Sequence, residues 1–176
     1  MYRICLVTLG LLIGFSPAEN SFADSRTPGK VIAGYVEKVT VLPADIVVSA
    51  KLDSGAKTSS INADKIERFK RDDQRWVRFE LVLKDAEDRV HRLPMERPIS
   101  RRVAIKREDR DHDRRVVVEL DFCFDGRQQR AEFSLNNRSK FIYPILLGRE
   151  FLAGTALIDP DQAFLTQAHC SSESEA

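Results

Sequence analysis

Hydrophobic and polar residues alternate with a period of two along most of the chain. The alternation is clearest from Val116 to Phe124, where every second side chain from Val118 onward is apolar. Two earlier stretches are rich in Val and Ile, which favour extended backbone. Such patterns are typical of strands that bury one face. We therefore predict strands over Val31 to Leu42, Asp45 to Leu52, Trp76 to Leu83 and Val116 to Phe124.

Turn and helix signals complete this outline. Asp125-Gly126 interrupts the apolar pattern before the pattern resumes at Ala131, as expected of a β-hairpin. Helical signals are limited to Asn62 to Lys70 and Arg149 to Ala153. The chain is thus predicted to be mostly β, a single-lobed barrel with one or two short helices.

The apolar faces of these strands define a candidate core. Its members are large apolar residues that occupy alternating positions of the predicted strands or of a late apolar run. We expect the following side chains to be buried: Leu52, Phe79, Leu81, Leu120, Phe122, Phe133, Ile145 and Leu147.

The first 23 residues have the character of a targeting segment. Arg3 precedes the apolar run from Ile4 to Phe15, which is too short to span a bilayer comfortably. Small residues follow it at the spacing that a signal peptidase requires. We expect residues 1–23 to be a cleaved secretory signal peptide and the mature protein to be periplasmic or secreted. The alternative is an N-terminal membrane anchor.

Composition narrows the function classes. A chain of 176 residues with 43% hydrophobic residues is long enough for one globular domain. Its 28 basic and 27 acidic residues produce no overall basic field, so no nucleic-acid partner is expected. No phosphate-binding glycine motif is present, and the three histidines are widely separated. We therefore expect no nucleotide, no metal site and no cofactor.

Two cysteines remain once the signal segment is removed. Export to an oxidising compartment would allow Cys123 and Cys170 to form a disulfide. Their spacing gives no information on the distance between them, so two unpaired thiols are the alternative.

The stretch from Lys106 to Arg115 holds alternating charges and no apolar residue. Asp111, His112 and Asp113 offer groups that would grip a charged substrate or a metal ion. Runs of mixed sign usually face water, however, so we interpret this stretch as a solvated loop between two strands.

Two motifs carry the candidate chemistry. The stretch "KLDSGAKT" brings Asp53 to the end of an apolar run, followed by a hydroxyl and a glycine. Much later, "YPILLGREFL" ends an apolar run in Gly148 and Arg149. Asp-Ser-Gly alone is weak evidence and is compatible with an ordinary turn, but the ordered pair is specific.

Together these motifs resemble the retroviral type of aspartic peptidase, in which a strand delivers Asp-[Ser/Thr]-Gly-Ala into a tight loop. The chain is most similar to a bacterial retropepsin-like aspartic peptidase family, often labelled ATP-dependent zinc proteases. The resemblance rests on Asp53 to Ser59, Glu132 to Leu135, Arg138-Ser139, Tyr143-Pro144 and Leu146 to Arg149. It implies a closed acid-protease-type barrel over residues 31–165, with residues 166–176 as a flexible tail.

The resemblance also implies a mechanism. Peptide hydrolysis by this route requires two carboxylates that share one proton, one activating a water and the other polarising the scissile carbonyl. One lobe supplies one aspartate, so the family implies a homodimer in which the two copies of Asp53 meet on the two-fold axis. The expected supporting residues, which hold or brace the loop, are Ser54, Gly55, Ala56, Lys57, Thr58, Gly148 and Arg149.

Departures from the viral pattern leave two functions open. Lys57 stands where the viral enzymes have an acidic residue, so Arg149 must find another partner, and Glu132 or Glu150 would have to neutralise the lysine. No glycine occurs between Gly55 and Gly126, so any lid would come from Leu93 to Arg110. The first function is a secreted aspartic endopeptidase acting on a peptide or protein. The second is a non-catalytic barrel that binds a peptide or an acidic cell-envelope ligand.

Overall fold

The computed structural model describes residues 29–105 and 113–170. These residues form strands almost throughout, with one short helix near the end of the described chain. No helix among them is long and apolar enough to cross a membrane. The elements are β1 (Val31–Gly34), β2 (Val36–Val41), β3 (Ile46–Asp53), β4 (Ser59–Arg71), β5 (Gln74–Lys84), β6 (Val90–Pro98), β7 (Arg101–Ile105), β8 (Asp113–Phe124), β9 (Arg127–Asn136), β10 (Ile145–Gly148), α1 (Arg149–Thr155) and β11 (Ala156–Asp159).

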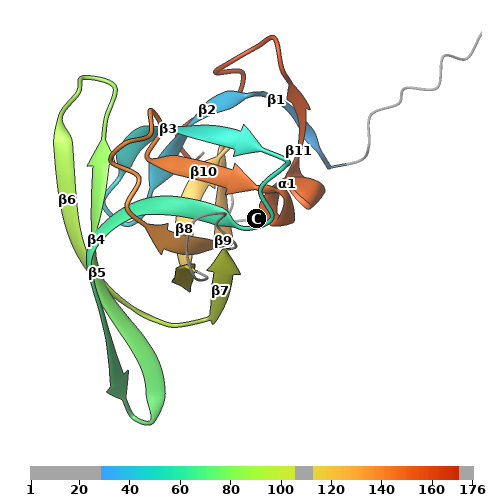
Figure 1. Ribbon diagram of the computed structural model, residues 1–176. Coiled ribbons are helices and arrows are strands. Elements are labelled where there is room, and N and C mark those ends of the chain that lie inside the picture. Colours follow the sequence, from blue (N-terminus) through green and yellow to red (C-terminus); the bar gives the residue numbers. More distant parts are fainter. Residues whose placement is uncertain (1–28, 106–112, 171–176) are drawn as a thin grey trace, which may run out of the picture.

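Six of the strands close into a barrel (Figure 1). Their order is β10-β3-β2-β8-β9-β4, and the pairing of β4 with β10 completes the ring. The prediction of a mostly-β, closed, single-lobed barrel is confirmed. The hairpin at Asp125-Gly126 is also confirmed, because β8 and β9 pair on either side of these two residues, both of which have positive φ.

Three further strands extend the barrel. β4 continues beyond the ring and pairs with β5, which in turn pairs with β6, so that the far end of the β4–β5 hairpin projects below the barrel in Figure 1. β7 pairs with the first half of β8. The last three residues of the charged stretch predicted as a solvated loop, 113–115, lie in β8 instead. Residues 106–112, including Asp111 and His112, lie outside the described part of the chain.

The helix predicted over Asn62 to Lys70 is wrong, because this segment lies within β4. The first half of β4 is buried between β9, β10 and β5, and these long-range pairings override local preference. An irregularity between Asp64 and Glu67, with Lys65 at φ 51°, interrupts the alternation of side chains. Beyond this irregularity the apolar residues of the sequence no longer show the period of two that marks a strand. The second predicted helix is confirmed as α1.

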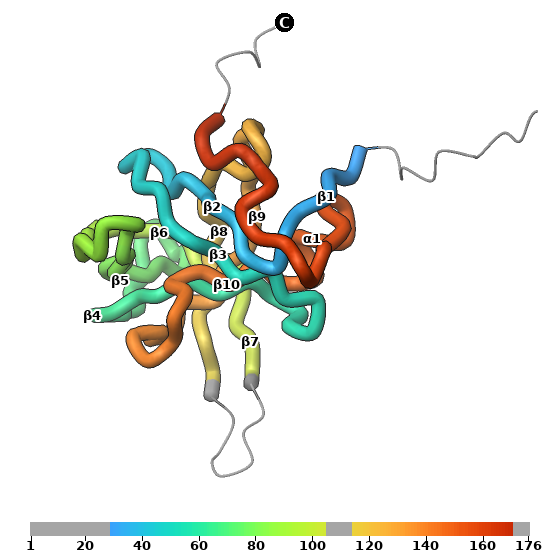
Figure 2. Tube along the Cα trace, turned by 90° about the horizontal axis from the view of Figure 1, so that it is seen from above, coloured from blue at the N-terminus to red at the C-terminus, as the bar shows by residue number. Residues whose placement is uncertain are grey.

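The chain after α1 returns over the first strands. β11 pairs in parallel with β1, and the next residues cross β2, as the red and blue segments show in Figure 2. Glu37, fully buried, accepts hydrogen bonds from the backbone N–H of Gly34, Leu165 and Thr166 at 2.6, 3.0 and 3.0 Å. The expectation of a flexible tail from residue 166 is therefore wrong as far as Cys170, and residues 171–176 lie outside the described part.

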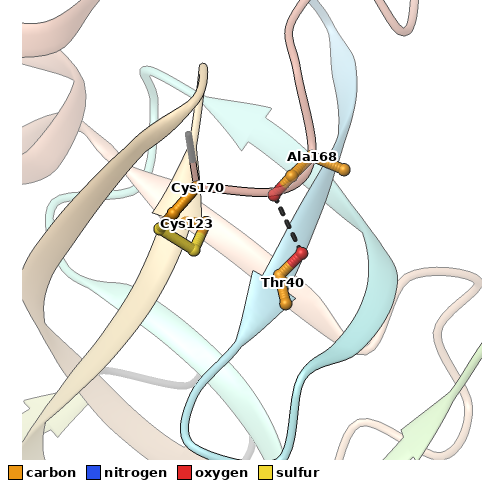
Figure 3. The surroundings of a disulfide bond; sticks show 4 residues. All are labelled: Thr40, Cys123, Ala168 and Cys170. Atoms are coloured by element: carbon orange, nitrogen blue, oxygen red, sulfur yellow. Dashed lines mark hydrogen bonds between the residues drawn. A yellow bond between two sulfur atoms is a disulfide. The ribbon is translucent and has the colours of Figure 1, made fainter. Parts of the chain in front are cut away.

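Cys123 and Cys170 form a disulfide, with their Cα atoms 5.2 Å apart. This settles the alternative that the sequence left open. Beside the disulfide, the Thr40 hydroxyl donates a 2.8 Å hydrogen bond to the carbonyl oxygen of Ala168 (Figure 3). The end of the described chain is thus fastened to both β8 and β2.

All eight side chains of the candidate core are buried, with exposures between 0 and 4%. Phe122 lies at the centre of an aromatic group, with ring centroids 5.5 Å from Phe133 and 5.2 Å from Phe151. The predicted inward faces of the strands are therefore confirmed.

Phe122→Ala is expected to lower the free energy of unfolding by about 3 kcal/mol or more, because it leaves a cavity among these rings. Chemical denaturation of the two proteins measures the difference. A loss below about 1 kcal/mol would show that the surrounding rings collapse into the space.

Candidate functional site

The two motifs of the sequence meet at adjacent strand ends. β3 and β10 pair in parallel, and their register places Leu52 opposite Leu147 and Asp53 opposite Gly148. Both strands carry apolar side chains into the core just before they end, which fixes the position of the loop that follows. Asp53 is therefore held at the rim of the barrel, where its side chain is half-buried.

The loop after β3 forms a cradle for one oxygen of this carboxylate. The backbone N–H of Gly55 donates to Oδ1 of Asp53 at 2.9 Å, and that of Ala56 donates to the same atom at 3.2 Å. Oδ2 accepts no hydrogen bond from the described part of the chain. One oxygen thus orients the carboxylate, and the other remains available to a water, a substrate or a second carboxylate.

Gly148 allows the loop to pack against the end of β10. A Cβ atom on Gly148 would lie 2.7 Å from the carbonyl carbon of Thr58 and 2.9 Å from the backbone nitrogen of Ser59. The Gly148 N–H donates to the Ser59 hydroxyl at 3.0 Å. The expected close packing beneath the loop is therefore present.

The first turn of α1 is bonded to the same loop. The backbone N–H of Arg149 donates to the carbonyl oxygen of Ala56, and that of Glu150 donates to the carbonyl oxygen of Lys57. The Arg149 guanidinium donates to the backbone oxygen of Ser54 at 3.0 Å. Arg149, which has no acidic residue at position 57 to pair with, therefore takes a loop carbonyl as its partner.

An ion-pair network surrounds the loop. Arg101, at the start of β7, donates to Oε2 of Glu132 at 2.6 Å and to Oε2 of Glu150 at 3.0 Å. It also donates to the hydroxyl of Thr58 at 3.0 Å. Nζ of Lys57 lies 3.7 Å from Oε1 of Glu150. Of the two acids proposed to balance Lys57, Glu150 is therefore its partner, while Glu132 pairs with Arg101.

Glu132 is ionised more readily than an ordinary glutamate. Partial burial opposes ionisation, but the hydrogen bond from Ser100 and the hydrogen bond and charge of Arg101 outweigh it and lower the pKa of Glu132. A lowered pKa in the folded state stabilises the fold above the ordinary glutamate pKa. This stabilisation is lost as the pH falls through the lowered value.

Arg101→Gln is expected to destabilise the protein by about 1 kcal/mol at about pH 7, since it removes the partly exposed ion pairs with Glu132 and Glu150. The difference from wild type should shrink as the pH falls from the ordinary glutamate pKa through the lowered pKa of Glu132, because a protonated Glu132 no longer pairs with Arg101. Urea denaturation of both proteins over this range of pH measures the difference. A difference independent of pH would mean that packing of the arginine stem, and not the ion pair, is what matters.

A cleft of about 450 Å³ opens beside the loop. Ala56, Lys57 and Thr58 form one side of it, and β7 contributes residues to its lining. Four of its lining side chains are cationic: Lys57, Arg101, Arg115 and Arg138. No acidic side chain of the described residues lines the cleft, but two of its cations, Lys57 and Arg101, are paired with Glu150.

Arg138 is the unusual member of this group, because it is only 7% exposed. Its guanidinium donates to the Ser60 hydroxyl at 2.8 Å and to the carbonyl oxygen of Tyr143 at 3.2 Å. No carboxylate in the described part of the chain lies within ion-pair distance of it. Burial lowers the pKa of Arg138, nearby Arg115 lowers it further, and the negative charge of Asp53 opposes both.

The structure thus gathers the predicted residues from Asp53 to Thr58 with Gly148 and Arg149 at one end of the barrel. Cys123 and Cys170 form the disulfide that holds the last described residues in place. Of the segment suggested as a lid, Leu93 to Ile105 lies in β6, β7 and their connection, and β7 lines the cleft. Sequence reasoning missed Arg101, which no spacing or motif distinguishes from its neighbours in an arginine-rich stretch.

The chain is similar to proteins that are already known. The model of the RimB-like family, described as retropepsin-like aspartic endopeptidase RimB, matches residues 32–169. The crystal structure of Lpg0085 from Legionella pneumophila, a protein described as having unknown function, is 30% identical to the chain. It superposes with a TM-score of 0.65 over 78% of this chain and 98% of that one.

Curated relatives carry a different name. Proteins from Shewanella pealeana and Parasynechococcus marenigrum, each named "Probable alpha-L-glutamate ligase", are 35% and 33% identical over 66% and 75% of this chain. The chain spans only 25% and 28% of the length of these relatives. The family match covers most of the chain, includes both motifs and agrees with the closed barrel. The chain therefore belongs to the RimB-like family of retropepsin-like aspartic endopeptidases.

Proposed function

We propose that the protein is an aspartic endopeptidase in which Asp53 from each chain of a homodimer forms the catalytic pair. The observation that carries this proposal is the cradle of Asp53, which binds one carboxylate oxygen through two backbone N–H groups. Such a carboxylate is oriented in advance, as catalysis requires. In the dimer one Asp53 activates a water, and the other, protonated, polarises the scissile carbonyl.

The buried Arg138 in the lining of the cleft supports an acidic substrate. A peptide that places carboxylates beside Arg138 would supply the anionic partner that the described residues do not provide, and a buried unpaired guanidinium favours such a partner. The names of the curated relatives refer to the ligation of α-L-glutamate, an acidic amino acid. We therefore expect glutamate-rich peptides to be cleaved in preference to neutral ones.

Export is part of the same proposal. Pairing of Cys123 with Cys170 supports an oxidising compartment, in agreement with the secretory signal expected over residues 1–23. N-terminal sequencing of the native protein tests this directly. A native protein that begins at Met1 and is recovered from the cytoplasm would exclude export.

The decisive experiment measures cleavage by the pure, disulfide-bonded protein. A fluorescent library of acidic and neutral peptides is incubated with it between about pH 3 and about pH 7, the range in which carboxylate pairs work. Light scattering under the same conditions reports the dimer. Cleavage by dimeric protein, strongest for the acidic peptides, is the expected result. A dimer that cleaves no member of the library would refute the peptidase.

The second candidate function is that of a barrel that binds a ligand without cleaving it. The buried Arg138 supports this function as much as it supports the peptidase. In that case the wild-type protein would bind an acidic peptide and leave it intact. Arg138→Gln would weaken binding in both cases, whereas only the peptidase would release fragments. Mass spectrometry of the peptide after incubation separates the two.

A further inference from the structure

A concentration of positive charge lies away from the cleft beside the Asp53 loop. A hollow of about 220 Å³ is formed between the far part of the β4–β5 hairpin and the segment that leads into β7. We call it the basic hollow, and its lining residues are Arg68, Phe69, Lys70, Arg75, Ile99 and Arg102. The four cationic side chains are all exposed.

The strand register explains why these cationic side chains lie on the same face of the hairpin. Arg68 pairs directly with Val77, and Lys70 with Arg75, so these side chains share one face of the hairpin. Val77 on this face is fully buried in the core. The hairpin projects from the barrel (Figure 1), and its register continues the face of Val77 with basic side chains. The backbone N–H of Ile99 donates to the carbonyl oxygen of Arg75 at 2.8 Å and joins the segment before β7 to the hairpin.

The other face of the same hairpin is charge-balanced. Arg71 and Arg78 both pair with Glu96, at 2.5 and 2.7 Å, and lie over aromatic rings. By contrast, Arg68, Lys70, Arg75 and Arg102 form no ion pair or side-chain hydrogen bond with the described part of the chain. The acids of the hairpin turn, Asp72 and Asp73, do not line the hollow. Four like charges held together without counter-charges favour an anionic ligand.

The hollow is separate from the proposed catalytic cleft. Neighbouring side chains on a strand point to opposite sides. Arg101 reaches Thr58 and Glu150 on one side of β7, and Arg102 faces the hollow on the other. A ligand in the hollow would therefore leave the cleft open.

From this arrangement we infer that the basic hollow binds a chain of phosphate groups, supplied by an inorganic oligophosphate or by the backbone of a single-stranded nucleic acid. Three of the four cations are arginines, whose planar fork matches phosphate oxygens in pairs. The hollow is smaller than the roughly 300–1,000 Å³ of pockets for drug-sized organic ligands. Compact phosphates concentrate more charge in such a volume than side-chain carboxylates do.

Titration calorimetry with inorganic tripolyphosphate tests the site, using the full disulfide-bonded protein. We expect saturable binding that Arg68→Gln/Arg75→Gln weakens about tenfold or more. Arg127→Gln/Lys140→Gln is the matched control, since it removes the same charge from exposed residues outside the hollow and should bind as wild type does. Equal weakening in both double variants, or no binding by wild type, would overturn the inference.

A labelled oligouridylate distinguishes the two sources of phosphate. If the backbone of a nucleic acid is the ligand, tripolyphosphate competes with it, and the double variant lowers the salt dependence of log K by about 1.4, two phosphate contacts at about 0.7 each. Binding of tripolyphosphate alone assigns a free oligophosphate. Hexaglutamate that binds as tightly through the same arginines would refute the phosphate assignment.

Two further variants keep the test independent of folding and of the proposed peptidase. Thermal unfolding checks the first double variant, and Lys70→Gln/Arg102→Gln replaces it if the hairpin is destabilised. Asp53→Asn should bind phosphate as wild type does, because the hollow lies on the other side of β7. Failure of peptide cleavage would thus leave this site standing, and failure of phosphate binding would leave the peptidase standing.

Discussion

Asp53→Asn is expected to lower kcat for peptide cleavage by about 10³-fold or more while the barrel remains folded. An amide cannot take a proton from the attacking water or pass one to the scissile carbonyl. Its carbonyl oxygen can still accept the hydrogen bonds that Gly55 and Ala56 donate to Oδ1, so the loop should keep its shape. Cleavage rates and thermal unfolding of the two proteins measure the two effects separately.

Asp125→Asn is the matched control for this variant. It makes the same chemical change at a turn after a strand, and asparagine tolerates the positive φ of 51° at this position. Its cleavage rate should equal that of wild type. If Asp53→Asn cleaves as fast as Asp125→Asn, the catalytic carboxylate lies elsewhere.

Gly148→Ala has the second largest expected effect. The added Cβ would lie 2.7 Å from backbone atoms of Thr58 and 3.0 Å from the carbonyl oxygen of Ala56, so the loop that carries Asp53 must move. A misplacement of about 1 Å can cost about 10²-fold in rate, and overpacking costs about 1–3 kcal/mol in stability. Kinetics and urea denaturation of this variant measure both losses.

Gly154→Ala distinguishes close packing from a general effect of replacing glycine. Gly154 lies in α1, and a Cβ there would meet nothing within 4 Å. This variant should keep its activity and gain about 0.4–1 kcal/mol in stability, as expected for alanine in a helix. A loss of activity like that of Gly148→Ala would show that α1, and not the contact beneath the loop, controls the site.

The sequence predicted the barrel well where strands bury one face. Phe79, Leu81, Phe122 and Phe133 all lie in regions of strict alternation, and all are buried. The prediction was wrong where burial changes along a strand, as in β4, whose outer half follows a bulge and is largely exposed. The prediction of a flexible tail was also wrong for Thr166, because a hydrogen bond to a buried glutamate cannot be recognised from a hydrophobic pattern.

The candidate site could be predicted only as far as local motifs reach. The loop from Asp53 and the packing of Gly148 were both expected from short strings, because each depends on a few adjacent residues. The partner of Lys57, the role of Arg101 and the burial of Arg138 depend on contacts between distant strands, which no spacing encodes. Likewise, a net charge of +1 is an average that conceals cations gathered on one face of a hairpin.

The parallel pairing of β3 with β10 also bears on when the site can form. The two strands come from opposite ends of the barrel's sequence. Pairings between residues far apart in sequence form late in folding, because closing the long loop between them first costs conformational entropy. Asp53 therefore leaves the ribosome long before the strand that positions it. A nascent chain ending before Gly148 contains the carboxylate but not its support. The loop that carries Asp53 would then gain its support only after β10 has been synthesised.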